Sequence, residues 1–151
     1  YNEKELFINS NFSKNQNSKK IYQPDIVSFT NSIYNGKPFF SIKEIIKDEK
    51  EYSKVGEIIR IRKDSKGNLF GLDTEKNIVW KIYPILQKIE LLAGNGKAGY
   101  KDGKKTEAEF DRIMDIDVDN NDNLYVTDFY NNAIRKITPD GVVSTIYKES
   151  N

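Results

Sequence analysis

Residues 93–146 read AGNGKAGYKDGKKTEAEFDRIMDIDVDNNDNLYVTDFYNNAIRKITPDGVVSTI, and this stretch decides the fold. A glycine-punctuated loop is followed by short runs in which apolar and polar residues alternate, with turn-forming residues between them. The runs are 113–118, 124–127, 133–139 and 142–146. Such alternation is typical of strands with one buried face. The stretch therefore predicts a unit of four short antiparallel strands.

A second copy of this unit precedes the first at an offset of 55 residues, so that Asp73 and Pro84 recur as Asp128 and Pro139. A third, degenerate copy lies upstream and lacks its innermost strand. Four-stranded units that recur every 40 to 55 residues or so are typical of β-propeller blades. We therefore predict an all-β protein of about three blades, the first incomplete. The blade pieces are 5–29, 55–93 and 110–147.

The best copy resembles an NHL repeat. The resemblance rests on Ala93-Gly94-Asn95-Gly96, Asn123-Leu124-Tyr125-Val126, Ile134-Arg135-Lys136-Ile137 and Pro139-Asp140-Gly141. It is close from Ala93 to Ile146, weaker from Val55 to Gly94 and degenerate from Leu6 to Phe29. Because NHL propellers usually close with about six blades, the resemblance implies that this chain is part of such a ring.

An open array of blades would leave sheet edges and apolar faces uncovered. We therefore expect further blades of the same chain, or a second copy of it, to complete the ring. The first residue is Tyr1 and not Met, so a processed product or an excised piece is expected. The expected location is extracellular, cell-surface or periplasmic.

Residues 30–54 form an insertion between the first two copies. Within it, Ile42, Ile45 and Ile46 stand at helical spacing, with a proline before them and a glycine after them. We predict a short helix within 40–54. Packing of its apolar stripe over a blade is favoured over a groove for a partner.

Composition excludes several classes of function. The chain has 151 residues, 37% hydrophobic and 31% charged, with a formal net charge of +1. These values suit a globular piece, and no apolar run is long enough to cross a membrane. The absence of Cys and His removes disulfide scaffolds, imidazole-bound zinc and His-dependent nucleophilic catalysis.

The unusual loops all fall at one end of the predicted blades. In an antiparallel meander, the loop between strands two and three lies at the same end as the loop that leaves strand four. Loops at 11–19, 30–54 and 95–112 belong to these classes, whereas the turns at the opposite end are short. Long loops on one face of a repeat protein often mark its binding face. The candidate binding residues are Lys97, Tyr100, Lys101, Arg112, Phe129 and Tyr130.

Two motifs in the lead-in loop have a structural interpretation. Gly94 to Gly99 match GxGxxG, but more turn residues follow where a dinucleotide site needs a helix. We therefore interpret the glycines as turn formers and predict no organic cofactor. The lysines of the same loop alternate with acids, so a clustered phosphate-binding charge is lacking and nucleic acid is not expected as a partner.

Carboxylates gather in the best copy. Asp115, Asp117 and Asp119 have the period-two spacing that places them on one side of a strand, where they would line a propeller channel. Carboxylate oxygens are ligands for calcium, so calcium is the metal that these three side chains could hold. Asp73 and Asp128 end corresponding strands, and we predict that both brace turns.

Three functions stay open. The leading hypothesis is a non-enzymatic binding or scaffold module that holds a protein, peptide or glycan on the loop-rich face. The alternatives are a propeller hydrolase or lactonase with a channel-bound calcium, and a structural repeat segment of a larger assembly. NHL-like amidating lyases use His-ligated zinc, and the lack of His argues against that type of enzyme.

Overall fold

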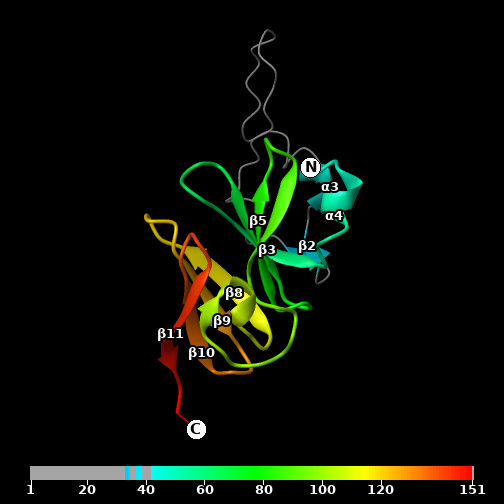
Figure 1. The fold of residues 1–151 in the computed structure, drawn as a ribbon. Helices are drawn as coiled ribbons and strands as arrows, with labels where there is room; N and C mark the ends of the chain where they lie inside the picture. Colours follow the sequence, from blue (N-terminus) through cyan, green and yellow to red (C-terminus); the bar gives the residue numbers. More distant parts are fainter. Residues whose placement is uncertain (1–32, 35–36, 39–41, 151) are drawn as a thin grey trace.

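The computed structural model describes residues 33–34, 37–38 and 42–150, and antiparallel sheets dominate it (Figure 1). A four-stranded sheet, called blade I here, has the order β3-β4-β5-β6. A five-stranded sheet, blade II, has the order β7-β11-β10-β9-β8. The predicted incomplete copy at 5–29 lies outside the described residues. Among the described residues, no helix is long and apolar enough to cross a membrane.

The strands of blade I are β3 (Ile58–Lys63), β4 (Leu69–Asp73), β5 (Ile78–Tyr83) and β6 (Lys88–Ala93). Those of blade II are β7 (Gly103–Lys104), β8 (Ile113–Val118), β9 (Leu124–Asp128), β10 (Ala133–Ile137) and β11 (Val142–Lys148). A separate hairpin joins β1 (Ile33–Tyr34) to β2 (Lys37–Pro38). The predicted all-β blades of four antiparallel strands are therefore confirmed.

The two blades repeat each other down to their irregularities. The pairing of the first two strands shifts between Ile58 and Arg60 in blade I and between Ile113 and Asp115 in blade II. Because each shift recurs at the same 55-residue offset, the two blades share one backbone plan.

One strand of blade II was not predicted. The short strand β7 pairs with the start of β11, and a 3-10 turn, η1 (Lys105–Glu107), follows it. Two residues are too few to show an alternating pattern, so this part of the lead-in loop had no sequence signature.

The main apolar core lies between the blades. From blade I it takes Phe70, Leu72 and Val79, each 0% exposed, together with Leu92 and Ala93 of β6. From blade II and its lead-in loop come Ala108, Phe110, Ile113, Ile116, Leu124, Val126, Ile137 and Val143. These side chains are contributed by alternate positions of facing strands, which is why the period-two pattern was informative.

The other face of blade I is covered by the insertion. Two single helical turns, α3 (Ile42–Ile45) and α4 (Glu49–Tyr52), stand in place of the one short helix predicted within 40–54. The break comes at Asp48, whose extended backbone and side chain cap α4 by accepting from the Glu51 N–H at 2.9 Å. Ile46 is 0% exposed and packs in the same cluster as Trp80. The stripe is therefore core, as the favoured interpretation expected.

Candidate functional site

The loop-rich end of blade II is built by bonds between two segments, 95–112 and 128–132. The Asn131 side-chain amide donates to the Gly99 carbonyl at 2.8 Å. The backbone N–H of Phe129 donates to the Arg112 carbonyl at 3.1 Å. The segments 95–112 and 128–132, which carry the predicted binding residues, therefore contact each other at one end of the blade, as the strand order predicted.

Three of the six candidate binding residues form one cluster, called the Arg112 cluster here. The rings of Phe129 and Tyr130 lie 5.6 Å apart at an angle of 48°, and the Arg112 guanidinium lies 5.9 Å from the Tyr130 ring centre. Both aromatic residues are 60% exposed. Two tilted rings beside a cation offer apolar area, π faces and hydrogen-bond donors to a ligand.

The backbone under this cluster is held in place. Arg112 has a positive φ of 60°, and its N–H donates to the Asn77 side-chain oxygen of blade I at 2.7 Å. The Tyr130 N–H donates to the Asp111 carbonyl at 3.1 Å. These bonds fix the cluster's backbone across the blade junction before any ligand arrives.

Tyr100 belongs to a different group of side chains. The guanidinium of Arg135 lies 5.0 Å from its ring centre, and the Lys148 ammonium lies 4.0 Å from it. Its hydroxyl donates to the Thr145 hydroxyl at 3.1 Å. The structure therefore ties Tyr100 to blade II rather than to the Arg112 cluster.

Lys97 and Lys101 are exposed at the same loop-rich end. Within the described part of the chain, neither ammonium group makes a hydrogen bond or an ion pair, whereas the Lys101 carbonyl accepts from Arg135 at 2.6 Å. The six candidates thus share one end of the blade without forming a single site.

Arg135 holds this end together, and sequence reasoning missed it. Its side chain is 0% exposed and donates to Asp128 at 2.7 Å, to Asp102 at 2.8 Å and to the carbonyls of Lys101 and Glu109. Desolvation alone would raise the pKa of the Asp102 carboxyl, but the hydrogen bonds from Arg135 and Thr145 lower it. The lead-in loop is therefore fastened to blade II through one guanidinium.

A sequence signal for Arg135 did exist in the repeat. At the equivalent position of blade I, the Trp80 indole N–H donates to Asp73 at 3.1 Å. Asp73 and Asp128 are both 0% exposed, and each also accepts a backbone N–H, from Gly56 and Asp111 respectively. Through these bonds the two aspartates brace the turns, as predicted. The side chain that donates from the third strand differs between the blades: it is Trp80 in blade I and Arg135 in blade II.

The three carboxylates proposed as calcium ligands contact other residues of the chain. Asp115 and Asp117 lie 3.6 Å and 3.5 Å from Arg60 and Arg62 of blade I. Asp119 lies beyond the end of β8 and accepts hydrogen bonds from Asn121, Asn123 and Tyr125. In the described part of the chain, no three His, Cys, Asp or Glu side chains gather as a metal site would require. Calcium binding stays a prediction of the sequence.

Asp119 gives the fold a dependence on pH. Desolvation would raise its pKa, but hydrogen bonds from Asn123, Asn121 and Tyr125 lower it from 3.8 to about 2. A lowered folded-state pKa stabilises the fold above the unfolded pKa, and this contribution is lost as the pH falls through the folded pKa.

We therefore expect Asp119→Asn to destabilise the chain at about pH 7, and we expect that difference to shrink as the pH falls from about 4 towards 2. Urea unfolding of both proteins across this range measures it. A difference that stays constant with pH would contradict the assignment.

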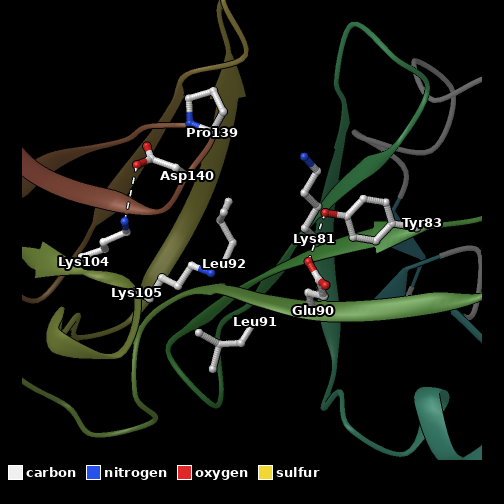
Figure 2. Close-up of a pocket in the computed structure, with 9 residues that line it drawn as sticks. All are labelled: Lys81, Tyr83, Glu90, Leu91, Leu92, Lys104, Lys105, Pro139 and Asp140. Atoms are coloured by element: carbon white, nitrogen blue, oxygen red, sulfur yellow. Dashed lines mark hydrogen bonds and ion pairs between the residues drawn. The ribbon is translucent and has the colours of Figure 1, made fainter.

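A cavity of about 170 Å³ lies between the blades at the short-turn end (Figure 2). The sequence did not predict it, because its walls come from distant segments. Four of its polar side chains form two pairs: the Tyr83 hydroxyl donates to Glu90 at 3.1 Å, and Lys104 lies 3.8 Å from Asp140. Lys81 pairs instead with Asp64, outside the lining, at 3.7 Å. The Tyr83–Glu90 pair lies within blade I and the Lys104–Asp140 pair lies within blade II, so neither pair crosses the junction of the blades.

Comparison with known proteins supports the fold. No family model matches the chain. Over 71 residues it is 34% identical to Protein SUPPRESSOR OF QUENCHING 1, chloroplastic, from Arabidopsis thaliana. The matched segment covers 47% of this chain and 7% of that protein. A solved protein of unknown function from Bacteroides thetaiotaomicron superposes with a TM-score of 0.50 at 30% identity, over 56% of this chain and 22% of its own.

Two further solved structures are similar at lower identity. An auxiliary nutrient binding protein from Bacteroides thetaiotaomicron has a TM-score of 0.49 at 18% identity, over 60% of this chain and 27% of that chain. Virginiamycin B lyase from Staphylococcus aureus has a TM-score of 0.45 at 19% identity, over 60% and 26%. This chain therefore spans 7% of the curated relative and a minor part of each solved protein.

Proposed function

We propose that this chain is a segment of an NHL-type β-propeller whose loop-rich face binds a protein, peptide or glycan without catalysis. The Arg112 cluster is the observation that carries the proposal. Its two rings are each 60% exposed, although the same chain buries Phe70 and Phe110 completely. Exposed aromatic residues next to arginine are the composition of binding hot spots.

Pre-organisation supports the same role. Side chains that must be ordered on binding reduce affinity, and a backbone that is already fixed avoids part of that cost. The segments that carry Arg112, Phe129 and Tyr130 bond to each other and to Asn77 before a ligand is present. The cluster therefore resembles a prepared contact surface more than a loose loop.

A non-enzymatic role is consistent with the polar groups of this end. Asp128 is fully buried and bonded to Arg135, and Asp102 is bonded to the same guanidinium. Neither carboxylate is placed to exchange protons with a ligand on the Arg112 cluster. We extend the proposal to an extracellular, cell-surface or periplasmic location, where protein and glycan ligands are both accessible.

Probing the chain with a glycan array and a displayed random-peptide library tests this proposal. We expect Phe129→Ala/Tyr130→Ala to weaken the strongest wild-type hit by tenfold or more, because hot-spot truncation costs about 2 kcal/mol or above. The matched control is Ile85→Ala/Leu86→Ala, an apolar pair 67% and 70% exposed in the turn between β5 and β6, at the opposite end.

The control is expected to leave affinity unchanged. An equal loss of affinity in both double variants would contradict the loop-rich face as the binding face. A wild-type chain that binds neither probe class would contradict the proposed ligands.

A further inference from the structure

We propose that the cavity between the blades is a binding site for a small organic acid, whose carboxylate is held by the Lys105 ammonium (Figure 2). Neither the sequence patterns nor the function proposed above assigns a ligand to this cavity. It lies at the short-turn end, away from the Arg112 cluster, so neither proposal depends on the other.

The acidic side chains of the lining already have partners. The Glu90 carboxylate lies 2.5 Å from the ammonium of Lys88, a residue outside the lining. The Asp140 carboxylate accepts from the Thr138 hydroxyl at 2.6 Å and lies 3.8 Å from Lys104. Both acids are therefore engaged by neighbours on their own blade.

One cation of the lining has no such partner. The lining holds three lysines against two acidic residues. Lys104 pairs with Asp140, and Lys81 pairs with Asp64 from outside the lining. In the described part of the chain, no hydrogen bond or ion pair reaches the Lys105 ammonium. The excess charge of the cavity is therefore one cation, which a ligand with one negative charge complements.

The backbone of Lys105 is fixed at the junction of the blades. Its N–H donates to the Gly141 carbonyl at 2.8 Å, and its carbonyl accepts from the Gly94 N–H at 3.0 Å. Lys105 has a φ of +52°, a left-handed conformation that is uncommon for residues other than glycine. Such conformations persist where the surrounding structure imposes them, and they concentrate at functional sites. The lysine is therefore positioned by a turn of blade II on one side and by the end of blade I on the other.

The Lys105 ammonium lies between the two walls. Figure 2 shows its side chain extending from the blade II side towards β6. The hydrogen bond from Lys88 is the main reason why the pKa of the Glu90 carboxyl is lowered, and the charge of Lys105 also lowers it. Lys105 is therefore within electrostatic reach of the blade I wall, although it forms no ion pair there. Because Lys105 is exposed, a ligand can reach it from solvent.

The rest of the wall and the volume define the body of the ligand. Leu91, Leu92 and Pro139 give the lining an apolar part, against which apolar ligand surface leaves water. The cavity of about 170 Å³ is smaller than the roughly 300–1,000 Å³ of sites for drug-sized molecules. A monocarboxylate with a short apolar body fits both properties. Inorganic phosphate fits less well, because it has no apolar surface to bury.

Titration of the chain with benzoate tests this proposal, followed through the backbone amide resonances of Leu92, Lys105 and Gly141 in NMR spectra. We expect these resonances to shift with a Kd of about 1 mM or below, which is within the efficiency of a ligand of this size. Benzamide, the neutral isostere, and inorganic phosphate are the control ligands. Both are expected to bind at least tenfold more weakly than benzoate.

Four variants separate the role of the ammonium from that of the fold. Lys105→Gln is expected to weaken benzoate binding tenfold or more, because it removes a charge-assisted hydrogen bond, whereas Lys105→Arg keeps the charge and should retain binding. Glu90→Gln is expected to tighten benzoate binding about threefold, because it removes a like charge from the lining. Lys66→Gln, at an exposed lysine in the turn between β3 and β4, is the matched control and should bind as wild type.

A wild-type chain whose resonances do not shift at benzoate concentrations well above the expected Kd would overturn the proposal. Equal binding of benzoate and benzamide, or equal effects of Lys105→Gln and Lys66→Gln, would also overturn it. So would a Glu90→Gln variant that binds benzoate more weakly, because the site would then not favour an anion. Tighter binding of inorganic phosphate than of benzoate would contradict the assigned ligand class. None of these outcomes involves the Arg112 cluster.

Discussion

Replacing Arg135 with alanine is expected to lower the free energy of unfolding by about 3–5 kcal/mol, because removing one partner of a buried ion pair strands the other. Arg135 and Asp128 are both 0% exposed and lie 2.7 Å apart. The substitution also frees Asp102 and two carbonyl groups of the lead-in loop. Urea denaturation measures the change.

Arg60→Ala is the matched control. Arg60 pairs with Asp115 at 3.6 Å, and the carboxylate is 59% exposed. Exposed ion pairs contribute less than about 1 kcal/mol, so this variant should unfold close to wild type. Arg135→Lys is expected to recover little, because an ammonium group cannot reproduce the forked contacts of a guanidinium. Equal effects of Arg60→Ala and Arg135→Ala would refute the buried brace.

Phe110→Ala is expected to cost about 3–5 kcal/mol of unfolding free energy, the range for large-to-small truncation of a buried aromatic residue. The Phe110 ring is 0% exposed in the core between the blades, and the Arg135 guanidinium lies 5.0 Å from its centre. The cavity would open at the junction that joins blade I to the lead-in loop. Because Phe110 and Arg135 touch, their effects should not add.

Phe129→Ala removes the same side chain from an exposed position. Phe129 is 60% exposed, so its truncation should change stability by no more than about 0.5 kcal/mol. The two variants separate packing from ligand contact: Phe110→Ala is expected to destabilise the chain, and Phe129→Ala is expected to weaken ligand binding. A strongly destabilised Phe129→Ala variant would mean that the ring is structural.

Much of the fold was predictable from local patterns. Alternation marked the strands, and turn residues such as Gly141, with a φ of +87°, marked their ends. The bracing role of Asp73 and Asp128 also followed from their places at the ends of corresponding strands. These features depend on neighbours in sequence, which is why one chain suffices to infer them.

The site was predictable in part. Strand order placed Arg112, Phe129 and Tyr130 at one end, and the structure brings these three together. It separates Tyr100 from them, because that ring packs on Arg135. The insertion was predicted as one helix, and the cap at Asp48 divides it into two turns. The helical spacing of Ile42, Ile45 and Ile46 persisted because all three lie in or directly after α3, where the Ile46 N–H donates to the Ile42 carbonyl at 2.7 Å.

The sequence by itself determined the repeat: four strands, their turns and the 55-residue offset that equates one blade with the next. Only the tertiary structure decided which of the equivalent positions are buried. Val79 is buried and Ile134 is 37% exposed, although both are β-branched residues at the same place in the blade. The pattern of a strand records which face prefers to leave water, whereas burial also requires a neighbour, and only the arrangement of the blades supplies one.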